Sequence, residues 1–127
     1  MALSEYRMPS NCSISYKCGG CDFRHIDYQF QLKLKKQLLE NILKDYKVAE
    51  IIEDENPYYY RNKVQIPVRE HKMGFYRKNS NDIVVFEDCL IESKIANQII
   101  SDLKGLLIDT YKEENLRHIV IRHGRNT

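Results

Sequence analysis

The 127-residue sequence lacks both the long apolar run of a membrane span and the apolar core of a signal peptide. No stretch approaches the roughly 18 apolar residues that a membrane-spanning helix needs. The N-terminal sequence MALSEYRMPS is too polar to direct secretion. We therefore expect a cytoplasmic protein, and the reducing conditions of that compartment argue against a framework of disulfide bonds.

Glycine is scarce, and its five residues do not form a nucleotide-binding loop. Gly19 and Gly20 are adjacent, whereas Gly74, Gly105 and Gly124 are isolated. A Rossmann-type cofactor site needs a glycine-rich loop between a strand and a helix, and no such loop is present. The net charge of +2 is too small to indicate a nucleic-acid-binding protein by itself. Length and composition are those of one ordinary globular domain.

Two helices are predicted from apolar residues at helical spacing. The first runs from Asp27, as the N-cap, to about Tyr46. The second is capped by Ser93. Its predicted buried stripe consists of Ile95, Ile99, Leu103, Leu106 and Leu107.

Five short strands are predicted at residues 48–52, 58–68, 73–77, 83–86 and 116–122, with turns at 70–72 and 79–81. Alternation in the second of these puts one set of residues on each side of the strand. Tyr60, Val64, Ile66 and Val68 face one way; Arg61, Lys63, Gln65 and Arg69 face the other. The whole pattern predicts an α+β domain of antiparallel hairpins and two helices, preceded by a cysteine-rich loop.

Three cysteines, Cys12, Cys18 and Cys21, lie close together in this loop, and the fourth, Cys89, lies far along the chain. A pair of thiols two residues apart with glycines between them forms the tight loop typical of metal sites. The spacing suits either zinc or a 4Fe–4S cluster. A thioredoxin-like redox pair is disfavoured because no strand precedes Cys18. Two alternatives stay open: His25 as a zinc ligand, and buried, non-ligating cysteines, above all Cys89.

Several segments of the chain resemble the iron–sulfur RNA (uracil-5-)-methyltransferases of the type that forms 5-methyluridine in 23S rRNA. The matching motifs are Cys12-x5-Cys18-Gly-Gly-Cys21-x3-His25, then Tyr28, Gln31-Leu32 and Lys35, Pro57 with Tyr60-Arg61-Asn62-Lys63, Gly74-Phe75-Tyr76-Arg77-Lys78, Ile83-Val84 and Cys89-x-Ile91. Two positions depart from the family pattern. Arg24 stands where a glutamine is usual, and Asn81 where a histidine is usual.

The resemblance implies that Cys12, Cys18, Cys21 and Cys89 hold a 4Fe–4S cluster. In that family, a separate cysteine thiolate adds to carbon 6 of uracil, so that carbon 5 attacks the methyl group of S-adenosylmethionine; a general base then removes the proton from carbon 5. Here no cysteine is left over and no cofactor loop is present. We therefore expect no catalytic residue and no S-adenosylmethionine site in residues 1–127.

The resemblance also implies that the chain is the central domain of a longer, monomeric enzyme. The small β-barrel RNA-binding domain that many relatives carry would precede it, and the Rossmann-like methyltransferase domain would follow it.

Basic and aromatic residues interleave between Pro57 and Ser80, which favours RNA as a partner. Six Lys or Arg residues stand there against one acid, Glu70, whereas residues 82–92 hold four acids and no base. The predicted RNA-binding residues are Arg61, Lys63, Arg69, Arg77 and Lys78. The alternative is a solvated sheet face with tyrosines packed beneath it.

Other readings stay open beside the rRNA methyltransferase. One is a zinc-binding nucleic-acid module with the same thiol ligands. Another is a ferredoxin-like electron carrier, although the C-x2-C-x2-C spacing and Cys-Pro pair of bacterial ferredoxins are absent. A third is a methyltransferase whose substrate is tRNA rather than 23S rRNA.

Overall fold

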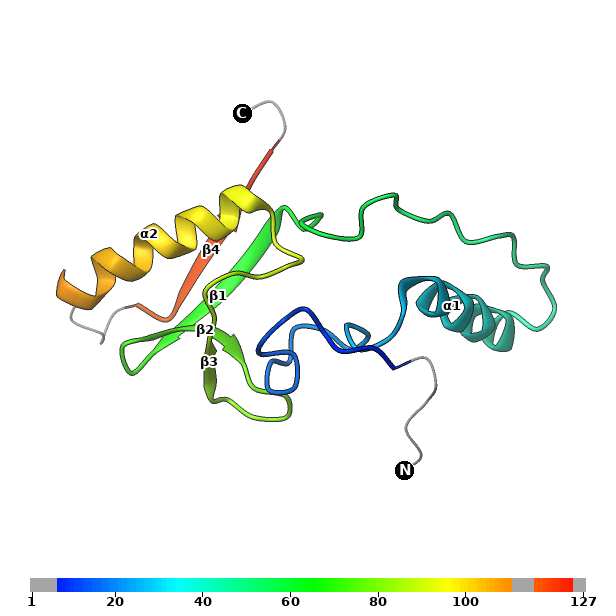
Figure 1. The fold of residues 1–127 in the computed structure, drawn as a ribbon, viewed down its shortest axis with the longest axis horizontal. Helices are drawn as coiled ribbons and strands as arrows, with labels where there is room; N and C mark the ends of the chain where they lie inside the picture. The colour runs from blue at the N-terminus through cyan, green and yellow to red at the C-terminus, as the bar shows by residue number, and fades with distance from the viewer. Residues whose placement is uncertain (1–6, 111–115, 125–127) are drawn as a thin grey trace.

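The computed structural model describes residues 7–110 and 116–124, which form two helices and one four-stranded antiparallel sheet. Along the chain the elements are α1 (Tyr28–Ile42), β1 (Lys63–Arg69), β2 (Lys72–Tyr76), β3 (Ile83–Val85), α2 (Lys94–Thr110) and β4 (His118–Arg122). α2 lies along the sheet, whereas α1 lies apart from both (Figure 1). The predicted α+β fold is confirmed. No helix in these two ranges is long and apolar enough to cross a membrane.

β1 and β2 form a tight hairpin, as the sequence predicts. Arg69 pairs with Lys72, and the two residues between them, Glu70 and His71, have φ values of 52° and 57°. Two successive positive φ values are typical of the type I′ turn, whose twist matches that of antiparallel strands. β3 and β4 add to the outer edges, which gives the strand order β3-β2-β1-β4.

The strand predicted at residues 58–68 begins later, at Lys63. Residues before it bond to the segment between β3 and α2 instead of to the sheet. The N–H groups of Tyr59 and Arg61 donate to the carbonyls of Leu90 and Ile91, and the N–H of Ser93 donates to the Arg61 carbonyl. Tyr59 reaches this path with a φ of 55°. The period-2 alternation therefore holds only from Lys63 to Ile66, since Pro67 is buried as well.

Gly74 in β2 occupies a position where only glycine fits. A Cβ added there would lie 2.7 Å from the Val84 carbonyl carbon on the neighbouring strand β3. Real Cβ atoms do not approach other atoms so closely, so any side chain would separate β2 from β3. The close approach keeps β3 paired through Gly74, Phe75 and Tyr76.

α1 begins as predicted but ends earlier. The Asp27 carboxylate accepts a hydrogen bond of 3.1 Å from the Phe30 N–H, which makes Asp27 the N-cap. The helix ends at Ile42 rather than near Tyr46, and none of its residues is fully buried. The predicted strand at 48–52 is wrong, because those residues pair with no other strand in the described part of the chain. Their segment instead returns beside α1 through side-chain contacts, such as Gln29 to Glu53 at 2.6 Å.

α2 is capped as predicted but buries a different face. The Ser93 hydroxyl accepts from the Ala96 N–H at 3.1 Å. The predicted stripe is wrong for Ile95, Ile99 and Leu106, which are 49%, 37% and 63% exposed. Ala96 and Ile100 are buried instead, and Leu103 is half-buried. The side chain of Leu107, also in that stripe, lies outside the described residues.

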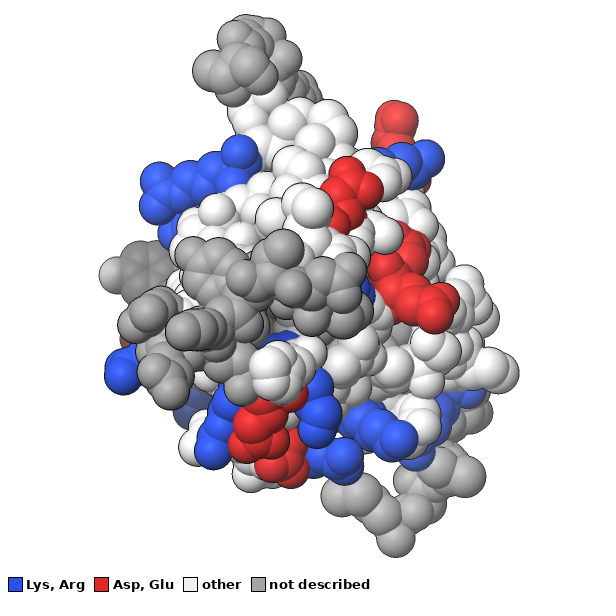
Figure 2. Space-filling model, turned by 90° about the vertical axis from the view of Figure 1, so that its left-hand side faces the viewer, with Lys and Arg blue, Asp and Glu red and all other residues white. Residues whose placement is uncertain are grey.

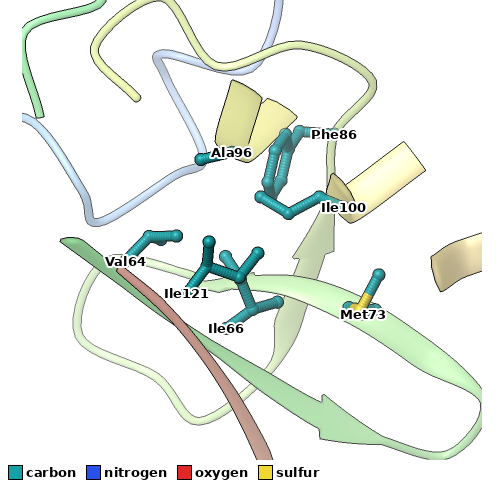
Figure 3. Packing of buried hydrophobic residues seen from close by; sticks show 7 residues of the cluster. All are labelled: Val64, Ile66, Met73, Phe86, Ala96, Ile100 and Ile121. Carbon is teal, nitrogen blue, oxygen red and sulfur yellow. The ribbon is translucent and has the colours of Figure 1, made fainter. Parts of the chain in front are cut away.

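The hydrophobic core lies between α2 and the sheet (Figure 3). Its buried members are Val64, Ile66, Met73, Phe86, Ala96, Ile100 and Ile121. Phe75 packs against this cluster and stacks on Phe86, with ring centroids 4.7 Å apart. Cys89 and Ile14 also pack against it, so the core supports the cysteine loop from below.

Candidate metal centre and nucleic-acid interface

The four cysteines line one small cavity of about 30 Å³. All four are free and half-buried. The rest of the cavity wall is largely apolar and includes Ile14, Phe75, Leu90 and Ile91. The structure thus brings Cys89, from the segment between β3 and α2, to the loop that carries the other three. An enclosed, mainly apolar site with four soft sulfur donors suits zinc or an iron–sulfur cluster.

The cysteine loop is held by the turn that joins β2 to β3. The Gly19 N–H donates to the Tyr76 carbonyl at 2.9 Å, and the Lys78 N–H donates to the Lys17 carbonyl at 3.1 Å. The Lys78 ammonium also pairs with Asp22 at 3.1 Å. Within the loop, the Gly20 N–H points at the Cys18 sulfur, 3.3 Å away. Such backbone N–H groups favour negative charge on sulfur.

Asn97 holds the fourth cysteine from inside α2. Its side chain accepts from the Cys89 N–H and donates to the Cys89 carbonyl, both at 2.9 Å, and it also donates to the Glu92 carbonyl at 3.3 Å. The sequence patterns described above do not predict this role of Asn97. A signal exists, because asparagine is unfavourable inside a helix unless its side chain has a specific partner.

The thiols are in surroundings that favour the protonated form. Burial raises the pKa of Cys89 to about 11, although two backbone N–H groups partly oppose this effect. Burial also raises the pKa of Cys18 and of Cys21. Arg24 and Arg61 act in the opposite direction on Cys21. A cation that binds here must therefore displace protons from the thiols.

His25 does not line the cysteine cavity. It is exposed, and its carbonyl accepts from the Met8 N–H. Across residues 7–110 and 116–124, no three His, Cys, Asp or Glu side chains are grouped closely enough to hold one metal ion. A single zinc ion needs its sulfur ligands about 2.3 Å from the metal, and hence close to one another.

Arg61 is not part of the exposed strand face on which we predicted it. Its guanidinium Nη1 lies 3.5 Å from Oε1 of Glu92, a residue that is fully buried. Burial raises the pKa of Glu92 to about 7, and Arg61 partly offsets this rise. The second carboxylate oxygen of Glu92 has no hydrogen-bond partner among the described residues. Arg61 therefore forms an ion pair with a buried acid beside the cysteines, a structural role that the sequence patterns predict for neither residue.

The other predicted RNA-binding residues are exposed on or beside the hairpins. Lys63 and Arg69 lie on β1, and Arg77 and Lys78 follow β2. With Lys72, Arg69 and Arg77 line a hollow of about 290 Å³. Figure 2 shows lysine and arginine side chains gathered along the lower part of one face, with acidic side chains among them.

The acids in and beside the hollow pair only loosely with its arginines. Arg69 lies 3.4 Å from Glu70, and Arg77 lies 3.8 Å from Asp82. All four side chains are about half exposed or more. Such exposed pairs are weak, so the arginines can exchange these partners for phosphate.

The sequence is similar to bacterial proteins named as uncharacterized RNA methyltransferases. One from Staphylococcus aureus (strain COL) is 35% identical, over 98% of this chain and 32% of that protein. One from Clostridium tetani (strain Massachusetts / E88) is 38% identical, over 98% of this chain and 31% of that protein. The chain thus spans about a third of the length of these curated relatives. No family model matches it.

The fold is similar to part of a solved structure, that of Pyrococcus abyssi tRNA (uracil-54, C5)-methyltransferase in complex with S-adenosyl-L-homocysteine. The TM-score is 0.71 at 24% sequence identity, and the match covers 95% of this chain and 30% of that one. At this identity the likeness shows a shared fold.

Proposed function

We propose that this chain is the cluster-bearing, RNA-recognising central domain of an S-adenosylmethionine-dependent RNA methyltransferase that forms 5-methyluridine in 23S rRNA. The observation that carries the proposal is a single cavity lined by four free thiols, beside an exposed basic hairpin. It occurs in a chain that is similar over 98% of its length to proteins named as RNA methyltransferases. Methyl transfer itself belongs to another domain of the protein, since all four cysteines line this cavity and none is left over to serve as the nucleophile.

The residues around the cavity fit a 4Fe–4S cluster. Cys12, Cys18, Cys21 and Cys89 supply four thiol donors, the number that such a cluster needs. When bound, a cluster would supply a negatively charged cross-link between the loop and the segment that precedes α2. The positive charges of Arg24 and Arg61 beside Cys21 suit that negative charge. Zinc is the alternative metal, but its ligands would have to come closer together than the described side chains are.

RNA binding is assigned to the exposed basic residues Lys63, Arg69, Lys72, Arg77 and Lys78. Three of them line one hollow, which suits a phosphate group of an RNA backbone. Transfer RNA is the second candidate substrate, because the solved structure with the shared fold is that of a tRNA methyltransferase. The basic hollow suits either RNA, since phosphate contacts carry no sequence information.

Anaerobic purification tests the cluster. We expect a brown protein with broad absorption near 400 nm, and iron and sulfide in equal amounts. A colourless chain with one bound zinc would instead support the zinc module. Incubation of the whole protein encoded by the gene with tritiated S-adenosylmethionine, and with unmodified rRNA or tRNA, tests the reaction. Methyl incorporation into only one of the two RNAs identifies the substrate; incorporation into neither contradicts the enzymatic proposal.

A further inference from the structure

A second, much larger cavity shares part of its wall with the cysteine cavity. It is a groove of about 600 Å³, lined by the cysteine loop, the first turns of α1 and residues 54–61. Arg24, Arg61 and Cys21 belong to the walls of both cavities. The volume lies within the range of roughly 300–1,000 Å³ typical of small-molecule sites, which is enough for a nucleotide.

Aromatic rings stand exposed along this groove. Tyr60 is 57% exposed and Phe23 is 41% exposed, and both line it. Tyr58 also lines it and carries the Arg24 guanidinium over its ring, 4.6 Å from the ring centroid. Exposed rings and a stacked guanidinium are the surfaces on which proteins stack unpaired RNA bases.

The acidic side chains of the groove already have partners, whereas its lysine has none among the described residues. Asp22 pairs with Lys78, Asp27 caps α1, and Asp54 accepts from the Asn56 N–H at 2.9 Å. Lys35, by contrast, forms no ion pair with any described residue.

Arg24, on the same wall, also has a hydrogen-bond donor without a partner in the described part of the chain. Its Nε is buried and has no hydrogen-bond partner among the described residues. A buried donor without a partner is costly and calls for an explanation. This wall of the groove therefore suits a ligand that carries negative charge and hydrogen-bond acceptors.

We propose that this groove binds one unstacked nucleotide of single-stranded RNA. The base lies against the Tyr58–Arg24 stack and the rings of Phe23 and Tyr60, and Lys35 meets the phosphate. This inference rests on the RNA-binding function proposed above and assigns it a base-binding site, separate from the basic hollow at the hairpin. A neighbouring part of the same protein is the other class of occupant, and the test below distinguishes it.

The test measures binding of a fluorescent single-stranded octauridylate to the anaerobically purified chain by anisotropy, at several salt concentrations. Tyr60→Ala should weaken binding at least about fivefold, since stacking of one base on an aromatic ring contributes that much or more. The salt slope should not change, because a neutral side chain releases no counterions. Tyr46→Ala is the matched control: Tyr46 is 76% exposed and lies outside the groove.

Two further measurements identify the bound group. Lys35→Ala should flatten the salt slope by about one unit. Removing the base at one position of the oligonucleotide should weaken wild-type binding by the same factor as Tyr60→Ala, with no further loss when both changes are combined. That non-additivity is expected only if the ring and the base touch.

Wild-type affinity in both Tyr60→Ala and Phe23→Ala would overturn the inference and leave the groove to another part of the protein. If Lys63→Ala and Arg69→Ala still weakened binding in that case, the RNA-binding function would stand without the groove. Absence of binding by the wild-type chain would contradict both proposals. If Tyr60→Ala weakened the binding of free uridine monophosphate by the same factor as the binding of the oligonucleotide, the groove would be a mononucleotide site. That result would also overturn the inference.

Discussion

The Asn97 side chain hydrogen-bonds to both backbone groups of Cys89: its carboxamide accepts from the N–H and donates to the carbonyl. The cysteine contributed from outside the loop is thus positioned by a helix that also packs in the core. Burial of Asn97 to 7% exposure keeps water from replacing these bonds.

Asn97→Ala should remove iron from the protein and destabilise it. The change leaves the N–H and carbonyl of Cys89 unpaired, which costs about 2–3 kcal/mol in the free energy of unfolding. We expect less iron per chain and a lower Tm. Gln98→Ala is the control, since Gln98 is exposed and its side chain bonds to Asp102, another exposed residue of α2. Equal iron content in the two variants would show that the hydrogen bonds from Asn97 to Cys89 are not needed for the cluster.

Replacing any one cysteine should abolish the cluster, whereas replacing His25 should not. In Cys18→Ser and Cys89→Ser we expect the absorption near 400 nm to disappear, because a four-iron cluster needs all its thiolates. His25→Ala should retain full absorption, since His25 lies outside the cavity wall. Loss of bound metal in His25→Ala would instead support a zinc site that includes this histidine.

The cluster-free domain should become less stable as the pH rises from 4.5 to 7. Burial raises the pKa of Glu92 from 4.5 to about 7. Over this interval the unfolded chain releases a proton that the folded chain retains, so the free energy of unfolding falls with pH. The fall should approach about 3 kcal/mol and be complete above pH 7.

Urea unfolding at pH 5 and pH 8 measures this effect. Glu92→Gln should remove most of the difference between the two pH values, whereas the exposed Glu55→Gln should keep the wild-type profile. An unchanged pH dependence in Glu92→Gln would assign the effect to another group.

Lys63→Ala combined with Arg69→Ala should weaken RNA binding by about 1–3 kcal/mol and flatten the salt slope by about two units. Both side chains are exposed, so the Tm should change little. Lys33→Ala combined with Lys44→Ala removes the same charge from exposed positions away from the hairpins and serves as the control. Equal salt slopes for the two double variants would exclude a specific basic surface. Arg61 is not replaced in this test because its removal would leave the buried Glu92 carboxylate without its ion-pair partner.

Two glycines should respond to alanine in opposite directions. Gly74→Ala places a Cβ against the Val84 carbonyl and should destabilise the sheet by about 3 kcal/mol or more. At Gly105 in α2 an added Cβ meets nothing within 4 Å. Gly105→Ala should therefore stabilise the protein by about 0.5–1 kcal/mol. Thermal unfolding of both variants checks the pair; similar Tm values would contradict the close packing of β2 and β3.

The hairpins were predictable because their turns are local. Asp27 and Ser93 were recognisable as caps for the same reason, since each bonds to a residue three positions on. The face that α2 buries was not predictable from spacing alone. The pair Ile95 and Ile99 and the pair Ala96 and Ile100 both recur at helical intervals. The second pair is the buried one, and Asn97, which bonds to the Cys89 segment, lies on the same side of the helix.

The strand predicted at 48–52 failed because apolar residues form a strand only where a partner edge is free. Arg61 was misplaced for a related reason: its backbone bonds to residues 91–93, so strand alternation does not extend to it. Contacts between distant segments decide both cases, and the local pattern carries no information about them. The meeting of Cys89 with the cysteine loop is also non-local; the number of cysteines and the resemblance to a known family indicated it, and no local pattern did.

The hydrogen bonds between residues 17–19 and residues 76–78 make the cysteine loop and the basic turn a single mechanical unit. Ordering one of them lowers the entropy that remains to be lost in ordering the other. Whatever free energy an occupied thiol cavity contributes to RNA affinity, bound RNA must contribute equally to retention of that occupant. Oxidation of the thiols would then lower the affinity for RNA, and bound RNA would slow the loss of the occupant to oxidation.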